Sequence, residues 1–266
     1  MKIFAINLQT RQDRLDLLTN TLAKHGYSWH ITNVPLTNAH SVIPSSVFQN
    51  NTQKVEILRF QRHPSGGLVG CFDSHYAIMK GCTEHLDDQE TIMILEDDVE
   101  FTPSFTPVIV TKAAQQLQLT DADLATFGIV GMPKGKDGHV SFRLSKHFRG
   151  NHAYLMQVSK LRKFVDFCDQ TLQGQFHYHI DETLELFFDK KLVTKPFVAL
   201  QAQSQSDNVW APGFPLLNNI TNTKYFTLMW SLPLLPLTNL ITFKHRQEIK
   251  KLVRDHRWKQ NMLSKE

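Results

Sequence analysis

Short apolar runs alternate with helix-like segments along this chain, and that alternation constrains its fold more than any other feature. The apolar runs are "KIFAINL" at 2–8, "TIMIL" at 91–95, "LATFGIV" at 124–130, "AYLMQVS" at 153–159 and "LVTKPFVALQ" at 192–201. Between them, helical patterns are expected after residue 10, where Leu15, Leu18 and Leu22 form a stripe, and over 67–86, 107–118 and 179–191. Strands alternating with helices predict a layered α/β domain with a mostly parallel central sheet flanked by helices.

Two local signals suggest where helices begin. Thr10 with Asp13 three residues later resembles a capping box, and Ser159 is suited to cap a helix that runs to about Cys168. Residues 35–66 and 132–150, which include the turn-like "MPKGKDGH", are expected to be loops.

The basic charge of the chain is concentrated at its end. Of the net charge of +4, residues 244–266 contribute +5, from eight Lys/Arg and three Asp/Glu, and residues 1–243 contribute −1. A basic tail on a neutral body favours a local anionic surface such as a membrane and argues against a nucleic-acid groove. We therefore divide the chain into a catalytic domain at 1–210 and an extension at 211–266 that ends in a basic helical tail. A solvated terminal helix is the alternative for that tail.

We expect neither a signal peptide nor a membrane-spanning helix in this chain. Residues 225–243 are apolar, but Pro233 and Pro236 interrupt them near the middle, which argues against a transmembrane helix. The first apolar run is too short for a signal peptide, and three cysteines without framework spacing favour a reducing compartment. We expect a cytoplasmic protein, placed peripherally on the cytoplasmic face of the inner membrane if the tail binds there.

Three adjacent carboxylates follow the run at 91–95. In "MILEDDVEF", Glu96, Asp97 and Asp98 come directly after a predicted buried strand, and like charges this close repel unless a cation is present. Ligands of open α/β sheets collect at the carboxyl ends of strands, and oxygen-only ligands suit Mn²⁺ or Mg²⁺. In an extended segment Glu96 and Asp98 would share a face. A solvated turn is the alternative.

An ordered series of motifs resembles glycosyltransferase family 25, the family of bacterial lipooligosaccharide and collagen sugar transferases. The segments are "INLQTRQDR", "GLVGCFDSH", "MILEDDVEF", "GNHAYLMQVSK", "HIDETL" and "PFVALQAQSQSDN", which together span about residues 1–208. The resemblance implies a GT-A-type fold that transfers a sugar from a nucleotide sugar, with the acidic triplet as a DxD-like motif. It implies Asp98 as the metal ligand, with Glu96 and Asp97 serving the ribose hydroxyls or metal-bound waters.

Further residues of these motifs are expected around the donor. Asn7, Arg11 and Arg14 follow the first strand, and a cation in the first turns of a helix is opposed by the helix dipole, so contact with the donor would explain it. An ion pair with Asp13 or Asp16 is the alternative for the arginines. Gly67 and Gly70 permit close backbone approach. The resemblance adds Ser74 and His75 to the donor pocket.

A second carboxylate pair lies in "FHYHIDET". An acceptor hydroxyl must lose its proton as it attacks the anomeric carbon, and we expect Asp181 to accept it, with Glu182 in reserve. Asp181 could instead be a helix N-cap. In an extended segment His177, His179 and Asp181 would share a face, which suggests a metal site. Asp207 is a further residue expected to line the site.

The preferred function is metal-dependent transfer of a hexose to a lipooligosaccharide or other surface glycan, with UDP-galactose as the expected donor and a lipid-linked glycan as one acceptor considered. The resemblance implies inversion at the anomeric carbon. Two alternatives stay open: a metal-dependent hydrolase of a nucleotide sugar or phosphoester, and a non-catalytic membrane-associated assembly factor.

Overall fold

The computed structural model describes residues 1–49, 54–128, 140–145, 152–174, 176, 178–201 and 235–263, with side chains from 244 onward in the last segment. Several expectations fall outside these residues. They concern the loop at 132–139, His177, Asp207 and the domain boundary at 210.

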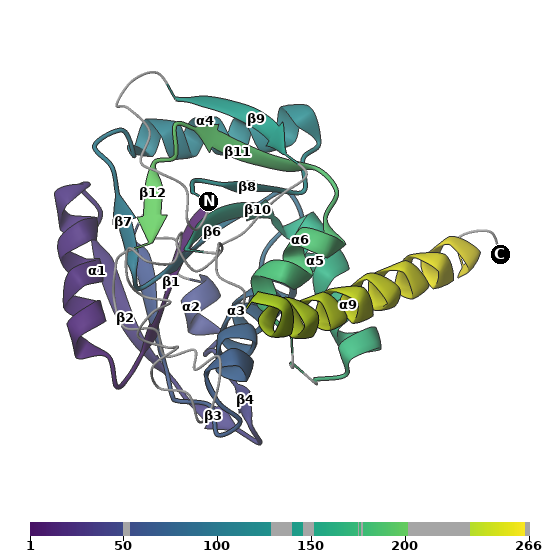
Figure 1. The fold of residues 1–266 in the computed structure, drawn as a ribbon. Helices are drawn as coiled ribbons and strands as arrows, with labels where there is room; N and C mark the ends of the chain where they lie inside the picture. Colours follow the sequence, from purple (N-terminus) through teal and green to yellow (C-terminus); the bar gives the residue numbers. More distant parts are fainter. Residues whose placement is uncertain are drawn as a thin grey trace.

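An eight-stranded sheet forms the centre of the molecule (Figure 1). Its strand order is β2-β5-β1-β6-β10-β8-β11-β9. The strands are β1 (Lys2–Leu8), β2 (Trp29–Val34), β5 (Val55–Phe60), β6 (Thr91–Glu96), β8 (Leu124–Thr126), β9 (Ser141–Ser145), β10 (Ala153–Gln157) and β11 (Lys191–Lys195). Two smaller described sheets pair β3 (Leu36–Thr37) with β4 (His40–Ser41), and β7 (Val99–Phe101) with β12 (Ala199–Gln201).

The pairing confirms the mostly parallel sheet. The strands β2, β5, β1 and β6 are parallel neighbours, and β11 is parallel to β8. Strand β10 runs antiparallel to both β6 and β8, and β9 runs antiparallel to β11 at the edge. The carboxyl ends of β1 and β6 therefore lie together, with Ile6 opposite Glu96 in the register.

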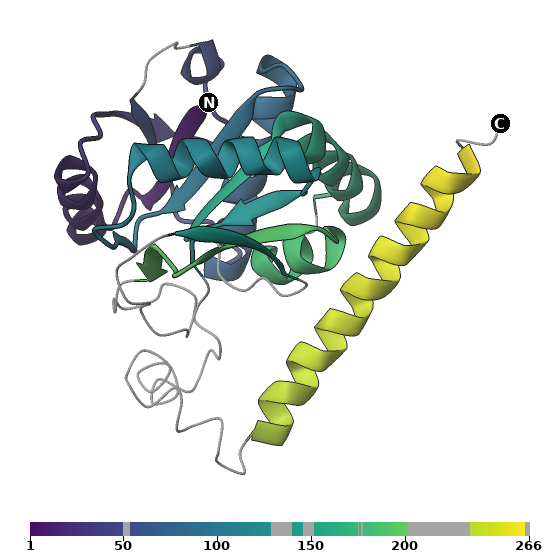
Figure 2. The ribbon, with the colours of Figure 1, turned by 90° about the horizontal axis from the view of Figure 1, so that it is seen from above.

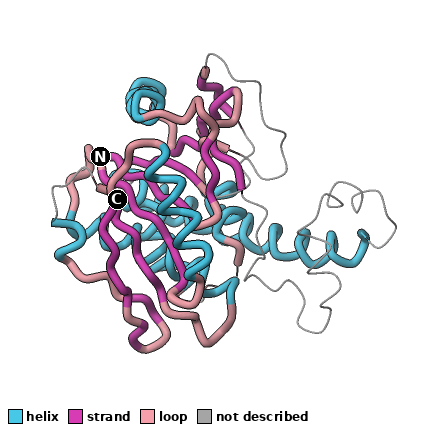
Figure 3. Tube along the Cα trace, turned by 90° about the vertical axis from the view of Figure 1, so that its left-hand side faces the viewer, coloured by secondary structure: helices cyan, strands magenta, loops and turns pink. Residues whose placement is uncertain are grey.

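Helices cover both faces of the sheet, as the α/β prediction required (Figure 3). On one face α3 (Gly67–His85), α5 (Val158–Phe167) and α6 (Ile180–Phe187) share a core with Phe4 and Ile94. On the other face α1 (Gln12–Lys24) and α4 (Pro107–Thr120) pack against Ile3, Ala5 and Met93. Alternate residues of β1 enter opposite cores because side chains of a strand point to opposite faces. The short α2 (Ser46–Gln49) and the π-helical turn η1 (Cys168–Leu172) complete these described elements.

The sequence prediction missed three strands of the central sheet: β2, which no expected element covered, and β5 and β9, which lie inside segments expected to be loops. The sequence of β5, "VEILRF", carries Glu56 and Arg59 among apolar residues, and these charges obscure the apolar run. Glu56 is nevertheless buried, and its carboxylate lies 3.0 Å from the Nδ1 of His30 on β2. The tertiary pairing with β1 and β2 thus overrides a weak local pattern.

The predicted helix starts are wrong at two places. Helix α1 begins with Arg11 as its N-cap and α5 with Gln157, and neither helix has a side-chain cap. Thr10 and Ser159 therefore do not act as caps. The helix at 107–120 does have one, because the Thr106 hydroxyl accepts a hydrogen bond from the Ile109 amide at 3.3 Å and Pro107 opens the helix.

The C-terminal helix α9 (Leu235–Leu263) confirms the helical tail and extends beyond the body of the domain (Figure 2). Its middle is anchored, since Ile249 and Val253 are buried in the same core as α3, α5 and α6, and the ring of His256 meets Phe167 edge-on. Among the described helices, none combines the length and the apolar character needed to cross a membrane.

Candidate functional site

The acidic triplet lies at the carboxyl end of β6, in the middle of the sheet. Glu96 is the last residue of that strand, and Asp97 and Asp98 form the turn into β7. Strand β1 ends beside it, which brings Asn7 and the start of α1 to the same edge. This is the position in an α/β sheet where ligands are expected.

Asp97 is held by side chains from β1 and α1. Asn7 donates through Nδ2 to Asp97 Oδ2 at 2.8 Å, and Arg14 donates through Nη1 to Asp97 Oδ1 at 3.0 Å. Arg14 Nη1 also lies 3.7 Å from Asp98 Oδ2. Burial raises the pKa of Asp97, although the Arg14 charge and the bonds from Asn7 and Arg14 lower it. The triplet therefore already has one internal counter-ion, Arg14.

Asp98 is the least satisfied member of the triplet. It is 5% exposed, and its Oδ2 accepts a hydrogen bond from Gln201 Nε2 on β12 at 3.1 Å. Its Oδ1 is buried and has no hydrogen-bond partner within the described part of the chain. Burial and then the charge of Glu96 raise the pKa of Asp98 to about 7, against the lowering effect of Arg14. An unpaired buried carboxylate oxygen is what a cation would satisfy.

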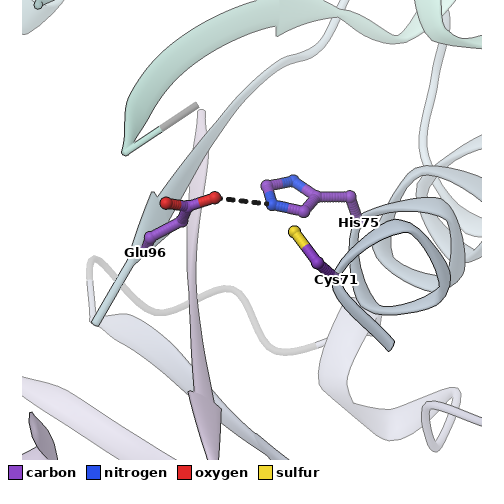
Figure 4. Close-up of side chains that lie close together, drawn as sticks. All are labelled: Cys71, His75 and Glu96. Carbon is purple, nitrogen blue, oxygen red and sulfur yellow. Dashed lines mark hydrogen bonds and ion pairs between the residues drawn. The ribbon is translucent and has the colours of Figure 1, made fainter. Parts of the chain in front are cut away.

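Glu96 faces helix α3 (Figure 4). Its Oε1 lies 3.2 Å from Nε2 of His75, and Nδ1 of that ring lies 2.8 Å from the hydroxyl of Tyr154 on β10. Burial raises the pKa of Glu96, but the His75 hydrogen bond and the charges of His75, His152 and Arg14 together outweigh this effect, so the net shift is downward. Asp97 and Asp98 lie in a turn and not in an extended segment, so the face that Glu96 and Asp98 were expected to share does not follow from strand alternation.

The other residues expected around the donor are placed less directly. Arg11 forms an ion pair with Asp13 at 2.8 Å, the local alternative that the sequence allowed. The Ser74 hydroxyl is buried and donates to the Cys71 carbonyl at 2.9 Å. A Cβ added at Gly70 would lie 2.9 Å from the Cβ of His63. The close approach that Gly70 permits in this structure is therefore to His63. Donor roles for these three stay predictions.

Asp181 and Glu182 open helix α6 but face different surroundings. Asp181 Oδ1 accepts the backbone N–H of Glu182 at 2.9 Å. Burial raises the pKa of Asp181, and the charge of Glu96 raises it further, which places Asp181 in the electrostatic environment of the triplet. Glu182 instead lies 4.0 Å from Arg246 of α9.

Two alternatives for Asp181 are wrong. The N-cap of α6 is His179, so Asp181 does not cap it, and the segment is helical from Ile180, so Asp181 is not on an extended face with the histidines.

Some site residues had no clear signal in the sequence. Arg59, at the end of β5, donates through Nε to Asn7 Oδ1 at 3.2 Å and so orients the amide that binds Asp97. Gln201 and Tyr154 contact Asp98 and His75 only because distant strands meet here. A polar residue at the end of a buried strand was the one available indication for Arg59.

Comparison with known proteins decides the family. A family model described as glycosyltransferase family 25, LPS biosynthesis protein, matches residues 1–184 of the 266. The chain belongs to glycosyltransferase family 25. The motif series that suggested it therefore identified the family correctly.

Two curated relatives are similar to part of the chain. Procollagen galactosyltransferase 2 of Homo sapiens is 32% identical over 110 residues, which cover 39% of this chain and 16% of that protein. The Mus musculus protein of the same name is 31% identical over 110 residues, which again cover 39% of this chain and 16% of that protein. The match thus spans about a sixth of the length of these relatives.

Solved structures are similar at the level of overall shape only. Galactosyltransferase LgtC, in complex with donor and acceptor sugar analogues, has a TM-score of 0.44 and 14% identity, covering 91% of this chain and 100% of that chain. A glycosyltransferase involved in glycosylation of the major capsid of PBCV-1 has a TM-score of 0.39 and 10% identity, covering 78% and 95%. Likeness at this level carries no argument about the site.

Proposed function

We propose that this chain is a metal-dependent hexosyltransferase that moves a sugar, with UDP-galactose as the donor, to a lipooligosaccharide or another surface glycan. The observation that supports it most is Asp98, a buried carboxylate with one unpaired oxygen beside Glu96 at the carboxyl end of a central strand. Family membership supports the reaction class, and the names of the curated relatives support galactose.

The residues present fit a hard divalent cation. Asp98 offers an unpaired oxygen and Glu96 a partly exposed carboxylate, and oxygen donors suit Mn²⁺ or Mg²⁺. When bound, the ion would neutralise the diphosphate leaving group as a Lewis acid. Asp97, whose two oxygens accept hydrogen bonds from Asn7 and Arg14, would serve the ribose hydroxyls or metal-bound waters through its remaining acceptor capacity.

Asp181 is the proposed base that takes the proton of the acceptor hydroxyl. Burial and the charge of Glu96 raise its pKa, and a carboxylate with a raised pKa is a stronger proton acceptor. Glu182 is the weaker candidate because it faces Arg246. One base and one displacement would give inversion at the anomeric carbon, without a covalent enzyme intermediate.

The first test measures unfolding with UDP, with and without Mn²⁺, on wild type and Asp98→Asn. A ligand at a hundred times its Kd stabilises by about 2.7 kcal/mol, which a melting curve resolves. We expect UDP to raise the Tm of wild type only with Mn²⁺, and Asp98→Asn to lose this response. Asp87→Asn, at an exposed aspartate, is the matched control and keeps it. Absence of any response in folded wild type would refute the nucleotide–metal site.

The second test separates the base from the donor site. Asp181→Asn is expected to lower transfer from UDP-galactose at least about a hundredfold while the UDP–Mn²⁺ shift in Tm persists. Glu182→Gln is the matched variant and should retain most activity. Rapid consumption of UDP-galactose without acceptor, at the rate seen with acceptor, would instead indicate the hydrolase.

We further propose that α9 holds the enzyme at an anionic membrane surface where a lipid-linked acceptor lies. Trp258 is 63% exposed on this helix. Together with Lys250 and Arg254 it lines a surface pocket of about 420 Å³. Basic residues at such a surface contribute about 1 kcal/mol each. Co-sedimentation with anionic but not neutral vesicles, reduced in Trp258→Ala, tests this. Equal binding to both vesicle types, or none, would favour a solvated helix.

A further inference from the structure

We propose that Cys71, His75 and Glu96 form a second, thiol-containing metal site that takes Zn²⁺ and competes with the sugar donor. The three side chains point toward one another in Figure 4, and one ligand atom from each lies within 4.8 Å of the others. The metal site rests on this geometry alone, and its competition with the donor also rests on the proposed function, because Glu96 belongs to both.

The positions of the ligands follow from two rigid elements. Cys71 and His75 are four residues apart on α3, which puts them on the same face of the helix, one turn apart. Glu96 ends β6, and β6 and α3 contribute to the same core. Zinc bonds of about 2.0–2.3 Å place the ligands of one tetrahedron about 3.3–3.8 Å apart, so small side-chain movements would complete the site.

His75 is already oriented in the way that metal-binding histidines are. Its Nε2 faces Glu96 Oε1 at 3.2 Å, while Nδ1 lies 2.8 Å from the Tyr154 hydroxyl. A hydrogen bond at the second ring nitrogen fixes the ring and the tautomer in many metal sites. In the metal-free protein Nε2–H donates to Glu96, and this proton is lost to solvent when the metal binds. With Nδ1–H donating to Tyr154, the Nε2 lone pair then faces the metal between Glu96 and Cys71.

The donor set selects a different ion from the one proposed at Asp98. A thiolate, an imidazole and a carboxylate are typical zinc ligands, whereas Mn²⁺ and Mg²⁺ favour oxygen. Three protein ligands leave one position open to water. Binding requires the Cys71 thiol to lose its proton to solvent, so affinity should rise with pH. Access is available, because the Glu96 side chain is 24% exposed and Cys71 is only partly buried.

The test is a Co²⁺ titration of the full chain without nucleotide or Mn²⁺. Cobalt bound by a thiolate gives a sulfur-to-metal absorption band in the near ultraviolet, which oxygen ligation does not give. We expect this band in wild type and in Cys168→Ala, the control at a fully buried cysteine, and not in Cys71→Ser. Zinc affinity from competition with a chromophoric chelator should fall at least about tenfold in Cys71→Ser and Glu96→Gln.

A second measurement avoids dependence on variants. Zn²⁺ should protect Cys71 of wild type from alkylation, read by mass spectrometry, and a chelator should restore the reaction. No sulfur band in wild type, an unchanged band in Cys71→Ser, or alkylation of Cys71 at the same rate with Zn²⁺ would each overturn the site.

The effect on the donor is tested separately. Zn²⁺ should reduce the UDP–Mn²⁺ shift in Tm of wild type but not of Cys71→Ser. A wild-type shift that Zn²⁺ leaves unchanged, in a protein that shows the cobalt band, overturns the competition and leaves the metal site standing. A missing UDP–Mn²⁺ shift with the band present refutes the proposed function alone.

Discussion

Replacing Asp98 by asparagine should stabilise the metal-free protein, even though it removes the proposed metal ligand. The carboxyl has its pKa raised from its usual 3.8 to about 7 in the folded protein, mainly by burial and by Glu96. A raised pKa means that the folded state prefers the neutral form. The contribution of Asp98 to the free energy of unfolding is therefore fully present below pH 3.8, where the carboxyl is neutral in both states. This contribution is lost as the pH rises through 7, because the buried carboxyl must then ionise.

The magnitude follows from the size of that shift. About three pKa units at about 1.4 kcal/mol each give a cost of at most about 4 kcal/mol at pH 8. Asparagine keeps an oxygen for Gln201 but turns an N–H toward the buried position of Oδ1, which costs about 1–2 kcal/mol. The net gain is about 2–3 kcal/mol, or roughly 5–10 °C in Tm for a chain of this size.

The assay is thermal unfolding of wild type and Asp98→Asn in chelator from pH 4 to pH 8. The Tm difference should grow with pH and vanish or reverse near pH 4, where the wild-type carboxyl is neutral in the folded state and only about half ionised in the unfolded state. Asp87→Asn should show no such trend. A difference that stays constant over this range, or a variant less stable than wild type at pH 8, would refute the reasoning about burial and repulsion.

Three further predictions concern packing and the tail. Ile249→Ala should lower the free energy of unfolding by about 2–4 kcal/mol in urea titrations, because Ile249 is buried, whereas exposed Lys251→Ala should have little effect. Equal effects would mean that α9 does not pack as described. Gly128→Ala should cost about 3 kcal/mol or more, since its Cβ would lie 1.9 Å from the Ala199 oxygen, and wild-type stability would contradict this. Arg246→Met should cost about 1–3 kcal/mol by removing an ion pair at 3.0 Å with buried Glu185; no change by calorimetry would show that pair to be unimportant.

Much of the fold could be predicted because its signals are local. The strands at 2–8 and 91–96 are continuous apolar runs, and α1 and α3 show helical periodicity with turn residues at their ends. The elements that the sequence prediction missed or misplaced also have physical reasons. Strand β5 carries two charges that only find partners once β1 and β2 lie beside it, and the starts of α1 and α5 use no side-chain cap.

The candidate site divides in the same way. The triplet itself was predictable, since carboxylates directly after a buried strand lie at a sheet edge. The balance of charge around the triplet could not be predicted, because it depends on which side chains from distant segments contact the three carboxylates. Arg14 offsets Asp97, Gln201 binds one oxygen of Asp98, and the other oxygen is left without a partner among the described residues.

By itself, then, the sequence determined the alternation of strands and helices, the family and the position of the acidic turn, because these rest on short motifs and on their order along the chain. Only the tertiary structure decided that His75 and Cys71 converge on Glu96, that Asp181 shares the field of the triplet, and that α9 packs into the core. These depend on contacts between segments tens of residues apart. Chain folding, rather than local pattern, sets the distances on which the chemistry of the site depends.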